Sequence, residues 1–149
     1  MRFPQLAAAA ACTFALSLCV TAAGAIELVT QEEAMLPDDP LGVERGVTRG
    51  PDILLISPAA NAGLVRSPLT LKIRFEAHGG SRIDQDSIVV TYHKVPAIDV
   101  TQRILPFIQP KGIEIPVAVL PVGSHRFRID VKDKAGRASA VLVTIGVRN

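Results

Sequence analysis

The sequence predicts an all-β protein whose main domain is a seven-stranded antiparallel sandwich. From Ile53 onward, apolar residues recur at every second position, which is the pattern of strands buried on one face. Short turns rich in Gly, Pro, Asp and Ser separate these runs. No stretch in this region has the periodicity of a helix of ordinary length. Short alternating strands separated by frequent turns favour two packed sheets.

The clearest strand covers residues 69–76, where four apolar side chains alternate with polar ones without interruption. In residues 126–132 the same alternation places Phe127, Ile129 and Val131 on the core side and sends the charged side chains outward. Turn residues separate the remaining predicted strands. These strands cover residues 53–57, 87–93, 98–105, 113–120 and 138–147.

Residues 1–25 have the pattern of a signal peptide. Arg2 supplies the positive charge, residues 6–20 the apolar run, and Ala23-Gly24-Ala25 the small-residue cleavage site. Cleavage after Ala25 predicts a periplasmic or secreted protein. The alternatives are an uncleaved membrane anchor over residues 6–26 and a lipoprotein modified at Cys19. Both cysteines lie in the signal peptide, so the mature chain has no disulfide.

Residues 26–51 form a leader whose composition differs from that of residues 52–149, the predicted sandwich domain. Thr30 and Glu33 fit a capping box, which predicts a short helix over residues 31–36. Pro37 and Pro40 then end it. We expect the leader to be partly disordered outside this helix. An extra edge strand from the leader is the other possibility.

Three motifs carry a resemblance to a known family. They are the pattern Gly123-x-His125-x-Phe127-x-Ile129-x-Val131-x-Asp133-x-x-Gly136-Arg137, the run Ile83-Asp84-Gln85-Asp86-Ser87-Ile88-Val89-Val90, and Ile56-Ser57-Pro58 followed by Arg66-Ser67-Pro68-Leu69. Over residues 51–147 the chain resembles bacterial immunoglobulin-like (fibronectin III-like) domains. The resemblance implies an immunoglobulin-like β-sandwich that serves as a spacer, an adhesin or a binding module. His125 stands where this family usually has Tyr, and Arg137 where it usually has Asn. The first departure affects the tyrosine-corner hydrogen bond of such domains.

Three carboxylates form a candidate calcium site. If strands alternate in direction, the turn over residues 79–86 and the turn over residues 134–136 lie at the same end of the sandwich. Asp84, Asp86 and Asp133 would then be neighbours, and carboxylate oxygens are the ligands that calcium prefers. Alternatively, each Asp accepts hydrogen bonds within its own turn.

His93 and His125 form a candidate site for zinc or copper at the opposite end, with Asp99 as a possible third ligand. Residues 57–64 and 71–75 are also faintly similar to the opening of the periplasmic copper-carrier family, which is another small sandwich. The alternative is that both histidines are structural.

Arg126, Arg128 and Lys132 form a candidate binding surface. With Asp130 they make an outward row on one strand, which suits an acidic glycan or a protein partner. The alternative is a solvated face whose charges keep the sheet soluble.

The sequence offers little for catalysis or for nucleic-acid binding. The mature chain has 15 Lys and Arg against 14 Asp and Glu, because Arg2 lies in the signal peptide. A nucleic-acid partner would favour a strongly basic chain. Neither a nucleophile elbow nor a phosphate-binding loop is present. We therefore predict a non-catalytic exported domain without a cofactor or small-molecule substrate, whose interaction or structural role involves an envelope or extracellular protein. The alternative is a periplasmic copper- or zinc-binding protein that uses His93 and His125.

Overall fold

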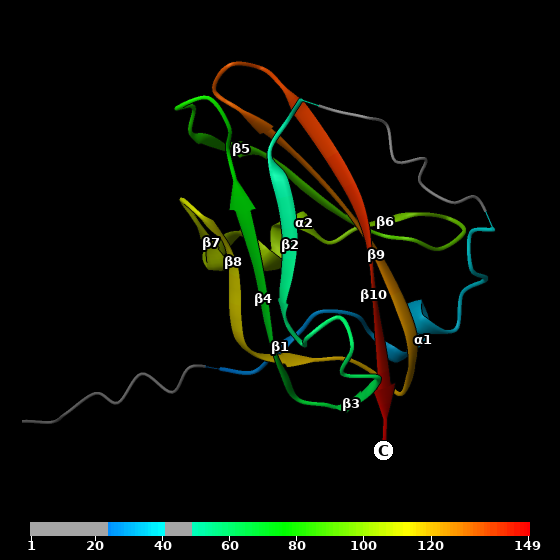
Figure 1. Ribbon diagram of the computed structural model, residues 1–149. Coiled ribbons are helices and arrows are strands. Elements are labelled where there is room, and N and C mark those ends of the chain that lie inside the picture. The colour runs from blue at the N-terminus through cyan, green and yellow to red at the C-terminus, as the bar shows by residue number, and fades with distance from the viewer. Residues whose placement is uncertain (1–23, 41–48) are drawn as a thin grey trace, which may run out of the picture.

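Two mixed five-stranded sheets pack face to face as a sandwich (Figure 1). The computed structural model describes residues 24–40 and 49–149. The first sheet has the order β1 (Ile26–Glu27), β8 (Gly112–Val119), β4 (Leu69–Glu76) and β2 (Asp52–Ser57), with β7 (Ile108–Gln109) also paired to β8. The second has the order β3 (Leu64–Arg66), β10 (Ala138–Arg148), β9 (Gly123–Asp133), β5 (Ile83–Tyr92) and β6 (Ile98–Asp99). The described residues also form three short helices: α1 (Gln31–Ala34), α2 (Thr101–Ile104) and the 3₁₀ helix η1 (Leu105–Phe107).

The predicted β-sandwich is confirmed, but the prediction of seven strands that are all antiparallel is wrong. β1 pairs with β8 in parallel, and β3 pairs with β10 in parallel. Both extra strands are only two or three residues long. Each belongs to a segment that runs along the edge of a sheet, where a short pairing needs no apolar alternation that a sequence pattern could reveal.

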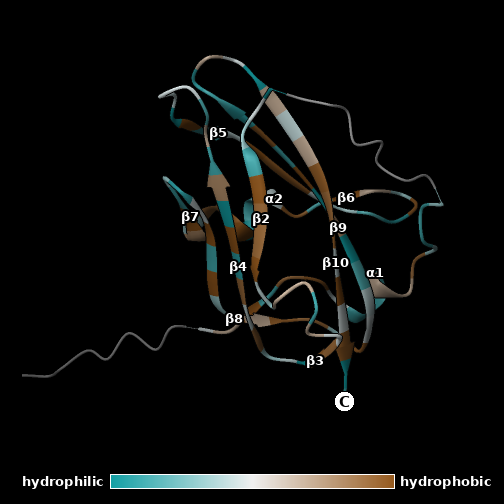
Figure 2. Ribbon diagram, in the orientation of Figure 1, coloured by the Kyte–Doolittle hydropathy of each residue, from teal (hydrophilic) through white to brown (hydrophobic). Residues whose placement is uncertain are grey.

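The alternation predicted for the two clearest strands is confirmed. Along β4 the side chains of Leu69, Leu71, Ile73 and Phe75 are buried, and the residues between them are more exposed. Figure 2 shows the same alternation of hydrophobic and hydrophilic positions along β4. Along β9 the odd-numbered residues from 125 to 133 are buried. The inward side chains of the two sheets form one core between them. Burial of each large apolar side chain in this core contributes roughly 2 kcal/mol of transfer free energy.

The strand predicted over residues 98–105 is mostly wrong. Only Ile98–Asp99 pairs with β5, and the chain then turns into α2 and η1. Asp99 Oδ1 accepts a hydrogen bond from the backbone N–H of Thr101 at 2.8 Å, and the Thr101 hydroxyl accepts one from the N–H of Val90 at 2.9 Å. These local side-chain bonds satisfy backbone groups that a longer strand would have paired, so the helical turn replaces the strand.

The leader contributes to the core. The predicted capping box is present, because Thr30 accepts from the N–H of Glu33 and Glu33 accepts from the N–H of Thr30. The helix it starts is shorter than predicted and ends at Ala34. Leu28 and Val29, just before it, are almost completely buried in the core. The leader therefore packs on the core through Ile26, Leu28, Val29 and Ala34.

Gly24 and Ala25, at the predicted cleavage site, are exposed. The rest of the predicted signal peptide and residues 41–48 of the predicted leader lie outside the described residues. Within residues 24–40 and 49–149, no helix has the length and apolar character needed to cross a bilayer.

Candidate functional site

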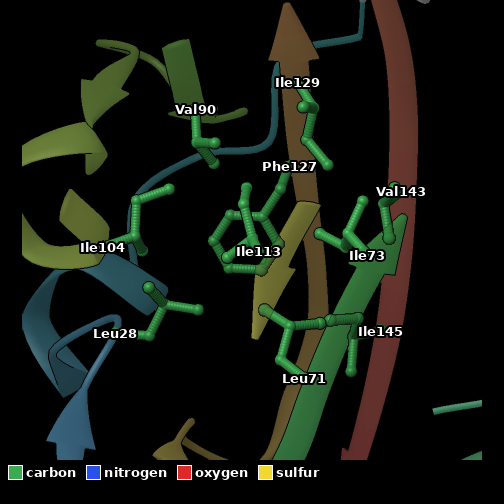
Figure 3. A pocket seen from close by; sticks show the side chains of 10 residues that line it. All are labelled: Leu28, Leu71, Ile73, Val90, Ile104, Ile113, Phe127, Ile129, Val143 and Ile145. Carbon is green, nitrogen blue, oxygen red and sulfur yellow. The ribbon is translucent and has the colours of Figure 1, made fainter. Parts of the chain in front are cut away.

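The pocket inside the core is a packing gap. Ten apolar side chains from both sheets and from Leu28 of the leader point into it (Figure 3). Its volume is about 10 Å³, which is near the minimum for one water molecule, and no polar group lines it to hold that water. It is therefore too small and too apolar to be a ligand site.

A much larger concave surface is an open groove at one end of the sandwich. Its volume is about 910 Å³, which is in the range of pockets for small organic ligands or short peptide segments. We call it the basic groove, because four cations and one carboxylate line it: Arg74, Arg82, Lys111, Lys134 and Glu76. The rest of its wall comes from apolar residues and from the polar residues Ser81 and Gln85.

Four chain segments bring these cations together. Arg74 is an outward residue near the end of β4, and Lys111 lies in the two-residue turn between β7 and β8. The backbone carbonyl of Lys111 accepts a hydrogen bond from the N–H of Phe75 at 2.9 Å, which fixes this turn against β4. Gly112 makes the close approach possible: its φ is +155°, and a Cβ there would overlap the carbonyl oxygen of Ile73.

The turn between β9 and β10 supplies Lys134. The backbone N–H of Lys134 donates to the carbonyl of Arg82 at 2.8 Å, so the two cationic residues are held on adjacent loops. Asp133 organises this turn, since its Oδ1 accepts from the N–H groups of Ala135 and Arg137 at 3.0 Å each. Gly136 completes the turn at a φ of +80°.

The charge of the basic groove is only partly balanced. Lys134 pairs with Asp84, and the hydrogen bond between them raises the pKa of Lys134. Arg74 lies 3.8 Å from Glu76 in an exposed contact. In the described part of the chain, the side chains of Arg82 and Lys111 have neither a hydrogen bond nor an ion pair. The groove therefore presents unneutralised positive charge in a chain that is nearly neutral as a whole.

The predicted row of Arg126, Arg128 and Lys132 faces away from the core, as parity required. However, two of its cations bind within the protein. Arg126 donates to the backbone carbonyl of Asp39 in the leader at 2.8 Å, and Arg128 makes two hydrogen bonds with Asp130, at 2.8 and 2.9 Å. Arg128 and Lys132 line only a shallow groove of about 250 Å³.

The three carboxylates of the predicted calcium site come to one end of the sandwich, but two of them are bound by cations. Asp84 pairs with Lys134, and Asp133 pairs with Arg137, whose Nε is 2.7 Å from Asp133 Oδ2. Burial would raise the pKa of Asp133, but hydrogen bonds from Arg137 and from the backbone lower it overall. Asp86 is exposed. Asp133 thus serves its own turn.

His93 directly follows β5, and His125 belongs to the neighbouring strand β9. The structure gives the two side chains different surroundings. The ring of His125 is 1% exposed, and both of its nitrogens are hydrogen bonded: Nε2 to the carbonyl of Pro121 at 2.8 Å and Nδ1 to the hydroxyl of Tyr92 at 2.9 Å. A metal at His125 would have to break one of these bonds. His93 Nε2 lies 3.7 Å from Asp39 Oδ2, and its buried Nδ1 has no hydrogen-bond partner in the part of the chain that the structure describes. Within residues 24–40 and 49–149, no three His, Cys, Asp or Glu side chains gather into a metal-binding group, and Asp99 caps the turn before α2.

The Tyr92–His125 pair is a buried neutral unit. A carbonyl oxygen only accepts, so Nε2 of His125 carries the proton, and Nδ1 accepts the proton of the Tyr92 hydroxyl. Burial lowers the pKa of His125 and raises the pKa of Tyr92 to about 12. Both groups therefore stay neutral at neutral pH, and they support the core rather than present a reactive group.

Three cations hold the leader in place. Arg103 makes a two-pronged contact with Glu33, which lowers the pKa of Glu33 to about 2, and it also donates to the carbonyl of Leu28. Lys94 is 6% exposed and binds both the carbonyl of Ala34 and the carboxylate of Asp38. Arg126 adds a hydrogen bond to the backbone carbonyl of Asp39, so these contacts tie the leader down and pair Glu33 and Asp38 with cations.

Sequence analysis identified no residue of the basic groove as a binding residue. Arg82 and Lys111 lie in different turns, each as a single cation beside Gly, Ser or Pro. Turn composition predicts that such residues are exposed, but which turns meet depends on the strand order of two sheets. The prediction that the turns around residues 79–86 and 134–136 share one end is the signal that approached this site, and it is confirmed by the bond from Lys134 to Arg82.

We compared the chain with family models, with curated proteins and with solved structures, and none of them matches it.

Proposed function

We propose that this protein is a non-catalytic, exported interaction domain that binds a negatively charged partner in the basic groove. The observation that carries the proposal is the convergence of Arg74, Arg82, Lys111 and Lys134 on one open groove of about 910 Å³. Among the described residues, Arg82 and Lys111 have no side-chain bond that would have to break before they bind an anion.

We further propose that the sandwich belongs to the immunoglobulin-like class. In such domains a Tyr near the start of one strand donates its hydroxyl proton to a backbone carbonyl a few residues upstream. His125, the third residue of β9, makes the equivalent bond to the carbonyl of Pro121. The imidazole thus replaces the phenol in the same role, which supports the resemblance at one of the two positions where the sequence departs from the family.

The cell envelope or the extracellular space is the proposed location. The charged start, the apolar run and the Ala-Gly-Ala site of residues 1–25 support export. The absence of cysteine after residue 25 means that the sandwich is stabilised by its apolar core and by the clamped leader, with no disulfide.

The chemistry of the groove favours a carboxylate-rich protein segment as the partner. Sugar recognition commonly uses an exposed Trp or Tyr, but the chain has no Trp, and its single Tyr, Tyr92, is completely buried. What the groove offers is separated positive charge together with the amide of Gln85 and the hydroxyl of Ser81. Such a site attracts side-chain carboxylates and holds them with charge-assisted hydrogen bonds.

The direct test is binding of a fluorescently labelled oligo-glutamate peptide, measured by anisotropy against a labelled oligo-glutamine peptide. We expect the glutamate peptide to bind, with an affinity that falls as salt is added. The double variant Arg82→Glu/Lys111→Glu should lose this binding. The matched control is Arg66→Glu/Arg148→Glu, which reverses two exposed cations paired across β3 and β10 and outside the basic groove. Equal losses in both variants would refute a specific groove.

A further inference from the structure

A second groove adjoins the basic groove and has the opposite charge. Its volume is about 500 Å³, and it shares Gln85 with the basic groove. We call it the acidic groove, because Asp86 and Asp99 line it and neither Lys nor Arg does. The hydrogen bonds from Thr101 lower the pKa of Asp99, which keeps this carboxylate ionised at neutral pH.

Exposed apolar side chains lie in the acidic groove beside its charges. Val89 is 40% exposed and Leu105 is 48% exposed, and both line it. The amides of Gln85 and Gln102 add groups that both donate and accept hydrogen bonds. Protein–protein interfaces commonly combine charged groups at the margin with apolar contacts and hydrogen-bonding amides, and the acidic groove has all three.

The two grooves are adjacent along β5. The basic groove is bounded by the start of β5 and the turn after β7, and the acidic groove by the middle of β5, α2, η1 and β7. A twofold axis near their shared residue, Gln85, would exchange the two grooves. The basic groove of one molecule would then face the acidic groove of the other, and this contact would occur twice, as an isologous dimer requires.

We infer that the partner of the basic groove is a second copy of this chain, which binds through its own acidic groove. The inference rests on the proposed function, because it names the carboxylates that the basic groove binds as Asp86 and Asp99 of that copy. A net charge of only +1 for the chain after residue 25 leaves little overall repulsion between two copies. Pairing of the two copies would also cover Val89 and Leu105.

Charge exchange between two variants tests this pairing. In the first variant, Arg82→Glu/Lys111→Glu makes the basic groove acidic. In the second, Asp86→Arg/Gln102→Arg makes the acidic groove basic. All four residues are exposed, and none of their side chains makes a hydrogen bond or ion pair with another described residue. Sedimentation velocity gives the molecular mass over a concentration series, and thermal melting confirms that both variants fold.

We expect the wild-type protein to dimerise, with a dissociation constant that rises with salt. For each variant alone, the dissociation constant of the dimer should rise at least about tenfold, because like charges then face each other in both contacts. An equimolar mixture of the two variants should recover the dimer, because both contacts again join opposite charges. The control Arg66→Glu/Arg148→Glu should dimerise like the wild type.

A wild-type protein that stays monomeric at every concentration would overturn the inference, and so would a mixture that recovers no dimer. Binding of the labelled oligo-glutamate peptide separates the two proposals. A monomer that binds this peptide leaves the proposed function standing and refutes self-pairing. A monomer that does not bind it refutes both.

Discussion

His125 donates a hydrogen bond from Nε2 to the carbonyl oxygen of Pro121 at 2.8 Å, four residues earlier in the chain. The bond ties the start of β9 to the loop before it. On the other side of the ring, Nδ1 accepts the proton of the Tyr92 hydroxyl, which joins β9 to β5. A single imidazole therefore satisfies two buried polar partners, which a residue without a second polar atom could not do.

Replacing His125 by Phe should destabilise the protein by about 2–4 kcal/mol, because the buried groups of Pro121 and Tyr92 are then left without a partner. Tyr92→Phe removes only the hydroxyl and should cost about 1–2 kcal/mol. The double variant should cost less than the sum of the two single variants, since the shared bond is lost only once. Urea unfolding of all four proteins measures the coupling. Strict additivity would contradict the bond between the two side chains.

Protonation of His125 should make the fold less stable in mild acid. Burial lowers the pKa of this imidazole below its ordinary value of 6.5. As the pH falls below about 6.5, His125 becomes protonated in the unfolded chain but stays neutral in the folded chain. The free energy of unfolding therefore decreases until the pH reaches the pKa of His125 in the folded protein. The slope contributed by this one site is at most about 1.4 kcal/mol per pH unit. Melting temperatures between neutral and mildly acidic pH should show the decrease, and His125→Phe should lack its contribution. A wild-type slope that survives in this variant would assign the effect to another group.

Truncating Leu28 should destabilise the whole domain, although this residue lies in the leader. Leu28 is 1% exposed and lines the core gap, so Leu28→Ala should cost about 2–5 kcal/mol in the free energy of unfolding. Met35→Ala, seven residues later, is the control: Met35 is exposed, and its truncation should change stability by less than about 0.5 kcal/mol. Equal and small effects of the two substitutions would show that the leader does not pack in the core.

A side chain at residue 112 should distort the basic groove. A Cβ on Gly112 would overlap the carbonyl oxygen of Ile73, and its φ of +155° is one that other residues rarely adopt. We expect Gly112→Ala to lower the free energy of unfolding by about 1–3 kcal/mol and to weaken binding of the oligo-glutamate peptide by moving Lys111. Gly63→Ala is the control, because Gly63 also has a positive φ but has open space around it and does not line the groove. Equal effects of the two variants on peptide binding would contradict the role of Gly112 in placing Lys111.

The sequence predicted what depends on local periodicity and local hydrogen bonding. Alternation identified β4 and β9 and their buried faces, and Thr30 with Glu33 identified the start of α1. The strand predicted for residues 98–105 is mostly absent, because hydrogen bonds to the side chains of Asp99 and Thr101 stabilise a helical turn there. The burial of Leu28 and Val29 depends on contacts with the sandwich, which no pattern within residues 26–40 displays. For the same reason the row at Arg126, Arg128 and Lys132 was visible in one strand, whereas the basic groove, assembled from separate turns, was not.

The most direct test of the basic groove is an NMR titration of the protein with the oligo-glutamate peptide, followed through backbone amide shifts. We expect the largest changes at Arg82, Lys111 and Lys134, which line the basic groove, and small changes at Arg126, Arg128 and Lys132 on the outer face of β9. Changes concentrated on the outer face of β9, with the groove amides unmoved, would contradict the account and return the binding surface to that row.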